Sequence, residues 1–141
     1  PPTPSKFHYI FNLRDLSRIY QGLVMTTPER FQNAAQMVRV WRNEVIRVIS
    51  DRLISEDDKN LVNDLIKNLV KSKSEFKSHI EYIFRDPILF GDYRNALDIG
   101  EPRIYEDMQD FEASKALFEQ ILQEYNEQNT PMNLVLFDDA V

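Results

Sequence analysis

The stretch "FNLRDLSRIYQGL", residues 11–23, predicts the first helix of the chain. Asn12 can act as an N-cap by accepting a hydrogen bond from a backbone N–H, and Asp15 stands three residues later, as in a capping box. Apolar residues then recur at helical spacing, at Leu16, Ile19, Tyr20 and Leu23. The pattern predicts a helix from about residue 13 to about residue 25.

Two arginines mark this helix as a candidate anion site. Arg14 lies in the first turn, where the helix dipole disfavours a cation by roughly a few tenths of a kcal/mol. Arg18 follows four residues later and therefore shares a face with Arg14. A helix N-terminus and two guanidinium groups directed at one region suit a phosphate. Without further context, the alternative is that these are exposed arginines paired with Asp15.

The next segment predicts a long helix. Thr26 and Glu29 have capping-box spacing and Pro28 suits a first helical position, so we expect this helix to run to about Leu53. One stripe along it is apolar and is expected in the core, Trp41 included: Ala34, Val38, Trp41, Val45 and Val48. The opposite face is charged and is read as solvated surface: Arg39, Arg42 and Arg47.

Further helices follow along the chain. Ser55 and three acids predict a helix start, and that helix ends near Lys71. "KSKSEFKS" is read as a loop, "HIEYIF" as a short helix, and residues 86–103 as a long irregular connector. A last helix is expected at about 108–127. The predicted fold class is all-α, a helical bundle with one long irregular connector.

Composition limits the function classes. The chain has 141 residues and a net charge of −6, with no Lys/Arg-rich run, so sequence-independent nucleic-acid binding is disfavoured. Charge is uneven, because residues 1–54 carry +4 and the remainder −10. No apolar run reaches the ~20 residues of a membrane span. The start lacks an initiator Met, and "NLVLFDDAV" stops inside an apolar segment, so we expect a piece of a longer polypeptide.

The sequence offers no active site of its own. There is no cysteine, and no G-x-x-x-x-G-K-[ST] phosphate-binding loop occurs. Glu75 and His79 lie four apart, but the paired Glu-x-x-His helices of a bundle metal site are missing, so no metal site is expected. We therefore expect that the fragment alone is not an enzyme and has no catalytic residues, and that at most it contributes to a neighbouring site.

Four sequence segments, in the same order along the chain, resemble the small helical lid of the third AAA+ module in dynein heavy chains. Their residues are typical of the axonemal (ciliary) proteins. They are "HYIFNLRDLSRIYQGL" at 8–23, "VRVWRNEVIRVISDRL" at 38–53, "RDPILFGDY" at 85–93, and "EPRIYEDMQDFEASKALFEQILQEYNEQNTPMNLVLFDDA" at 101–140. Residues 54–84 match least. The resemblance implies a linker from the preceding large subdomain at 1–6, a lid at 7–128, and a linker into the fourth module at 129–141.

In that family the lid packs on a large αβ subdomain and closes one wall of the nucleotide site. A sensor II arginine near the start of a lid helix reaches the γ-phosphate. The resemblance assigns this role to Arg14, with Arg18 as second candidate. ATP or ADP with Mg²⁺ would be bound mainly by the neighbouring large subdomain, and the isolated fragment would hold no cofactor.

The resemblance also implies partners and a location. The partners are the adjacent AAA+ subdomains of the same chain, and microtubules only through the whole motor; no nucleic acid and no membrane are expected. The location is the cytoplasmic cytoskeleton of the ciliary axoneme, and the function is to relay nucleotide-dependent motion for ATP-driven motility. The alternative is a free-standing acidic helical protein-interaction module. A microtubule-binding element is disfavoured because tubulin is acidic.

Overall fold

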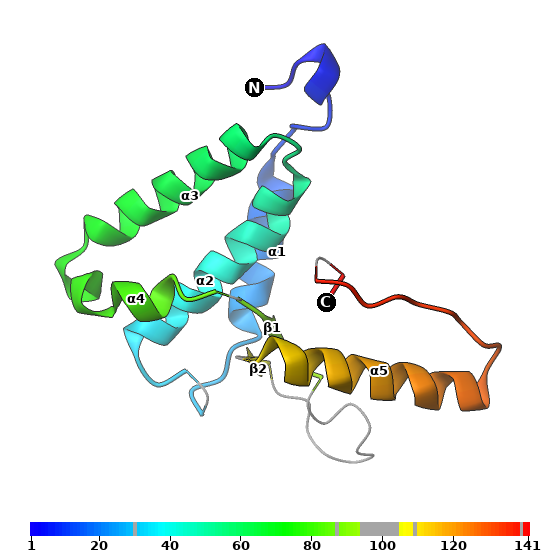
Figure 1. Ribbon diagram of the computed structural model, residues 1–141. Helices are drawn as coiled ribbons and strands as arrows, with labels where there is room; N and C mark the ends of the chain where they lie inside the picture. The colour runs from blue at the N-terminus through cyan, green and yellow to red at the C-terminus, as the bar shows by residue number, and fades with distance from the viewer. Residues whose placement is uncertain (30, 87, 94–104, 109, 139) are drawn as a thin grey trace. The chain divides into compact units, whose positions relative to one another are not determined.

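The computed structural model describes the chain except residues 30, 87, 94–104, 109 and 139 (Figure 1). Its contacts divide the chain into two units, Pro1–Asp86 and Pro87–Val141, which are described separately. The described residues are mostly helical and include one small two-stranded sheet, so the predicted fold class is confirmed.

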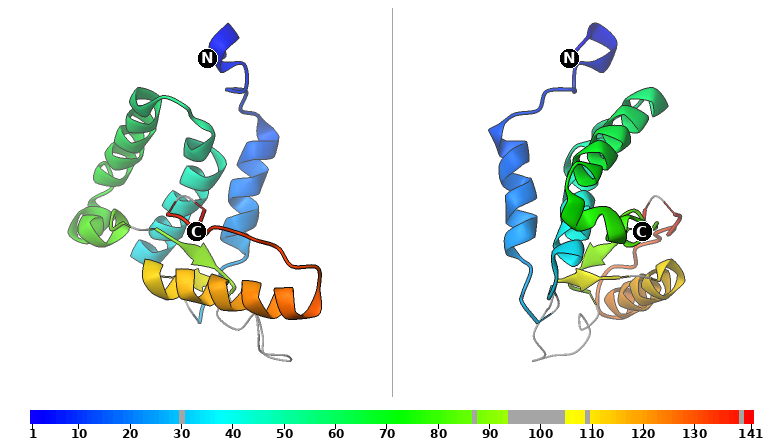
Figure 2. Two further views of the ribbon diagram at one scale, coloured as in Figure 1. Left: turned by 45° about the vertical axis from the view of Figure 1, so that its right-hand side comes forward. Right: turned by 90° about the vertical axis from the view of Figure 1, so that its left-hand side faces the viewer.

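The first unit carries four α-helices: α1 (Leu13–Val24), α2 (Ala34–Val48), α3 (Glu56–Lys71) and α4 (Ile80–Ile83). Short 3-10 turns lie before α1, between α2 and α3, and between α3 and α4: η1 (Pro4–Lys6), η2 (Ser50–Arg52) and η3 (Ser74–His79). α1 lies alongside α2 (Figure 2). The predicted third helix and the short helix at "HIEYIF" are confirmed, whereas the loop expected over "KSKSEFKS" is wrong, because much of it is η3.

The predicted start of the second helix is also wrong. α2 begins at Ala34 because Asn33 and Gln36, not Thr26 and Glu29, form the capping box: Gln36 N donates to Asn33 Oδ1 at 3.0 Å, and Asn33 N donates to Gln36 Oε1 at 3.4 Å. The Thr26 hydroxyl instead donates to the Leu23 carbonyl at 2.7 Å, so it closes α1. At the other end, α2 stops at Val48 and η2 completes the segment.

Two apolar clusters form the core of this unit. Ile19, Val45, Val48 and Ile66 make the first, and Ala35, Val70 and Ile83 the second. Trp41 packs against both, which confirms its expected place in the core. The stripe on α2 therefore packs with α1 and α3 in the first cluster and with α3 and α4 in the second.

Arg39 and Arg42 are buried, at 1% and 6% exposure, so the expectation of a fully solvated charged face on α2 is wrong. Arg39 Nη1 donates to the carbonyls of Tyr82 and Arg85 at 3.1 and 2.7 Å, and Arg42 Nη2 donates to Asp86 Oδ1 at 2.9 Å. The last carbonyls of a helix have no partner within it, and guanidinium donors satisfy them here. The two arginines thus cap α4 from α2.

The second unit contains strands β1 (Phe90–Gly91) and β2 (Glu106–Asp107) and helix α5 (Phe111–Gln128). The strands are antiparallel, with Phe90 opposite Asp107 and Gly91 opposite Glu106. Asp110 caps α5 by accepting from Glu112 N at 3.0 Å and Ala113 N at 3.2 Å. The predicted last helix is confirmed. Much of the predicted connector lies outside the described residues, and β1 falls within the part that is described.

Candidate functional site

The N-terminus of α1 has the predicted capping box. Asn12 Oδ1 accepts from Arg14 N at 2.9 Å, and Asp15 Oδ2 accepts from Asn12 N at 2.8 Å. These bonds fix the first turn of the helix, and with it the backbone that carries Arg14.

Both candidate arginines lie on the surface of α1. The side chain of Arg14 is exposed, and its guanidinium makes no hydrogen bond or ion pair with any residue that the structure describes. Arg18 is exposed as well, and its Nη1 lies 3.8 Å from Asp15 Oδ1, a loose contact at the surface. The structure therefore places two cations four residues apart on one helix, with donor capacity left for an anion.

Asp15 pairs with Arg52, a contact that the sequence did not predict. Arg52 Nη1 donates to Asp15 Oδ1 at 2.8 Å, and Arg52 Nη2 donates to the carbonyls of His8 and Ile10, both at 3.1 Å. The Arg52 guanidinium also lies 4.7 Å from the centre of the Phe11 ring. Arg52 thus ties η2 to the chain that enters α1, and Asp15 pairs with Arg52 and not with Arg14.

A second set of hydrogen bonds, around Asp58, holds the N-terminal segment to the start of α3. Asp58 Oδ2 accepts from Lys6 Nζ at 2.6 Å and from the Tyr9 hydroxyl at 3.1 Å, and Ile54 N donates to that hydroxyl at 2.8 Å. The hydrogen bond from Lys6 lowers the pKa of Asp58, and the same bond raises the pKa of Lys6. No local spacing predicts this cluster, because its partners are about fifty residues apart along the chain.

Gly22 sets how closely α1 approaches α2. A Cβ at this position would overlap Cδ and Oε2 of Glu44 and lie 2.7 Å from Oε1. Glu44 is fully buried, at 0% exposure, and its Oε2 accepts from Arg47 Nη2 at 2.5 Å. Since the carboxylate fills the space that a side chain would take, α1 is positioned by the missing Cβ of Gly22.

The outer face of α1 is apolar and lacks a partner among the described residues. Leu13, Leu16, Tyr20 and Val24 recur at spacings of three and four, and all are exposed, Leu13 at 79% and Val24 at 82%. This stripe runs beside the arginine face of the same helix. An uncovered apolar stripe of this kind is typical of a surface that packs on another protein part.

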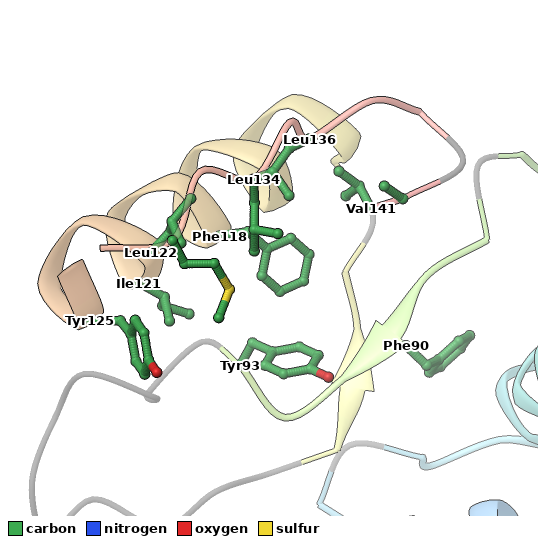
Figure 3. A pocket seen from close by; sticks show the side chains of 11 residues that line it. Phe90, Tyr93, Phe118, Ile121, Leu122, Tyr125, Leu134, Leu136 and Val141 are labelled. Atoms are coloured by element: carbon green, nitrogen blue, oxygen red, sulfur yellow. The ribbon is translucent and has the colours of Figure 1, made fainter. Parts of the chain in front are cut away.

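The second unit holds an apolar cavity of about 610 Å³. It lies between α5, β1 and the extended C-terminal segment (Figure 3), and the Tyr93 and Phe118 rings meet edge to face with centroids 5.0 Å apart. Its lining is Phe90, Tyr93, Phe118, Ile121, Leu122, Tyr125, Met132, Leu134, Leu136, Ala140 and Val141. With no charged side chain in that lining, the cavity is not suited to hold a phosphate.

Neither a metal site nor a membrane-spanning helix is found in the described part of the chain. No group of three histidine, aspartate or glutamate side chains there is placed to hold a metal ion. None of the described helices combines the length and the apolar character needed to cross a lipid bilayer. The arginine face of α1 is thus the candidate site.

Comparison with known proteins gives matches over the whole chain. Residues 1–84 match the AAA+ lid domain family. The chain is 70% identical over all of its 141 residues to dynein axonemal heavy chain 10 of Homo sapiens. It is also 47% identical, again over its full length, to the dynein-1-alpha heavy chain of the flagellar inner arm I1 complex of Chlamydomonas reinhardtii. The chain spans 3% of the length of each of these proteins.

Proposed function

This chain belongs to the AAA+ lid domain family, and on that premise we propose that it is the lid of the third AAA+ module of an axonemal dynein heavy chain. Similarity to axonemal heavy chains along its full length supports the assignment to this motor. The choice of the third module rests on the four sequence blocks quoted above. Residues 7–128 would form the lid, 1–6 the linker from the preceding large subdomain, and 129–141 the linker into the next module.

Arg14 is the residue that we propose as the sensor II arginine, with Arg18 as the second candidate. The observation that carries this proposal is an exposed guanidinium in the first turn of a capped helix, without a carboxylate partner among the described residues. The positive end of the helix dipole adds to the charge of the guanidinium, so the place suits a phosphate. The nucleotide, ATP or ADP with Mg²⁺, would be held mainly by the large subdomain and would supply the phosphoanhydride bond.

The apolar stripe on α1 supports the same proposal. In an assembled module, Leu13, Leu16, Tyr20 and Val24 would be buried against the large subdomain, which brings the arginine face to the edge of the nucleotide site. The hydrogen bonds made by Arg52 and Asp58 would make the segment that precedes α1 move with the lid. Nucleotide-dependent motion would then pass to the next module as a rigid-body rotation, in the service of ATP-driven motility along microtubules in the ciliary axoneme.

The test is nucleotide binding by the full-length heavy chain carrying Arg14→Ala. Hydrogen bonds to charged groups contribute about 1.5–3 kcal/mol, so we expect the affinity for a fluorescent ADP analogue at the third module to fall roughly 10- to 150-fold. Arg14→Lys should recover part of the loss, because lysine keeps the charge but not the bidentate geometry.

Lys67→Ala provides the matched control, because it removes another exposed cation, on α3. It should leave the affinity unchanged. If Arg14→Ala and Lys67→Ala behave alike, Arg14 does not contact the nucleotide, and Arg18→Ala becomes the next variant to measure. If all three variants match the unmodified chain, neither arginine contacts the nucleotide and the sensor II proposal fails.

A further inference from the structure

Gly22 leaves an opening in the row of α1 that carries the two candidate arginines. Arg14, Arg18 and Gly22 are spaced four residues apart, so successive members lie about one helical turn from each other along one face. Gly22 has no side chain, and the buried carboxylate of Glu44, from α2, fills the space where its Cβ would be. The third place in the row is therefore taken by a residue of the neighbouring helix.

Glu44 also holds the Arg47 guanidinium at this place. Arg47 Nε and Nη2 both donate to Glu44 Oε2, at 3.1 and 2.5 Å. Because the same oxygen would overlap a Cβ on Gly22, the guanidinium lies one hydrogen bond away from the space that a side chain at position 22 would occupy. Arg47 thus continues the row of arginines, although it comes from α2.

The Arg47 side chain is open to solvent on the side away from Glu44. It is 55% exposed, whereas the Glu44 side chain is 0% exposed. Arg47 Nη1 makes no hydrogen bond with any residue that the structure describes, and a guanidinium has N–H donors on more than one edge. One edge of the group is held by a carboxylate, and another is available to an anion at the surface.

The charge around this row is positive overall. Three carboxylates lie nearby: Asp15, paired with Arg52; Glu44, paired with Arg47; and Asp51, exposed in η2 next to Arg52. Four arginines stand against them, which leaves one positive charge in excess: Arg14, Arg18, Arg47 and Arg52. Since two of the three carboxylates are buried, the exposed side of the row presents mainly guanidinium groups.

We propose that Arg47 is a further phosphate-binding residue of the arginine face of α1, held beside Arg18 by Glu44 in the space that Gly22 leaves open. This inference rests on the proposed function, because it assigns a third cation to the same nucleotide. Glu44 is a positioning residue: it orients the guanidinium, but its charge also weakens the attraction of Arg47 for an anion.

The test is binding of the fluorescent ADP analogue to the full-length heavy chain carrying Glu44→Gln. Glutamine keeps a carbonyl acceptor for Arg47 but removes the negative charge, so we expect the affinity at the third module to rise, by up to about fivefold. A purely structural role of Glu44 predicts no change or a loss. Asp57→Asn, which removes one exposed negative charge from α3, is the matched control and should leave the affinity unchanged.

Arg47 itself is tested in the Glu44→Gln background, because its removal from the unmodified chain would leave a buried carboxylate without its arginine partner. In that background Arg47→Ala should lower the affinity about tenfold, and Arg47→Lys should retain part of it. The proposal is overturned if Glu44→Gln does not raise the affinity, or if Arg47→Ala matches Glu44→Gln alone.

Arg14→Ala separates this proposal from the one on which it rests. If Arg14→Ala weakens binding but Arg47→Ala does not, the Arg47 assignment fails and the sensor II proposal stands. If neither arginine substitution weakens binding, both proposals fail.

Discussion

Replacing Gly22 by alanine tests how α1 is held against α2. In an ordinary helix interior this change stabilises a protein by about 1 kcal/mol, because alanine has the higher helix propensity. Here the added methyl group would overlap the Glu44 carboxylate, whose residue is 0% exposed and so has no solvent to move into. The two effects oppose each other, and their sizes decide the outcome.

The packing effect is the larger one. Forcing a methyl group into a filled site costs about 1–3 kcal/mol. Displacing the buried Glu44 from Arg47 adds a share of the roughly 3–5 kcal/mol that breaking a buried ion pair costs, reduced because the Arg47 side chain is 55% exposed. After subtraction of the propensity gain, we expect Gly22→Ala to lower the free energy of unfolding by about 2–4 kcal/mol.

Urea unfolding followed by far-UV circular dichroism measures this change, and a Glu44→Ala background isolates its cause. Once the carboxylate is removed, the space opposite Gly22 is open, so Gly22→Ala should be neutral or stabilising by up to about 1 kcal/mol. The reasoning is refuted if Gly22→Ala stabilises the unmodified chain, or if it costs the same in both backgrounds.

Two further predictions concern charge and capping. Because its bond to Lys6 lowers the pKa of Asp58, the ionised carboxylate stabilises the fold at neutral pH, and this is lost as the pH falls below about 4 through the lowered pKa. Asp58→Asn should therefore lower the thermal unfolding midpoint relative to the unmodified chain at pH 7, but not at about pH 2. A difference in midpoint that does not change with pH would contradict this. Asn33→Ala should cost about 1 kcal/mol in urea unfolding, whereas Ser55→Ala should cost less, because the Ser55 side chain makes no capping bond; equal losses would argue against the cap.

What could be predicted from the sequence was local. The Asn12 capping box, the acidic first turn of α3 and the long helix near the C-terminus each depend on residues a few positions apart, and all are confirmed. The start of α2 was not predictable in the same way, because the sequence offers two capping boxes, at Thr26 and at Asn33. Thr26 bonds back to Leu23, and this contact ends one helix rather than starting the next.

What could not be predicted depends on distant partners. Arg39 looked like a surface residue because its partners, the carbonyls of Tyr82 and Arg85, lie more than forty residues away. On α3 the exposed row, Leu61, Leu65 and Leu69, is as apolar as the buried row that holds Ile66 and Val70, so spacing alone does not reveal which one faces the core. In the candidate site, the position of Arg14 could be predicted from its own turn, whereas the pairing of Asp15 with Arg52, thirty-seven residues away, could not.

The burial of Arg39 and Arg42 has a mechanical consequence. α4 has only four residues, too few to resist being unravelled by a pull on the chain that follows it. Both arginines donate hydrogen bonds to the segment from Tyr82 to Asp86, so this segment is attached to the middle of the much longer α2. A pull on the chain after Asp86 would therefore have to break these side-chain hydrogen bonds as well as the turns of the short helix.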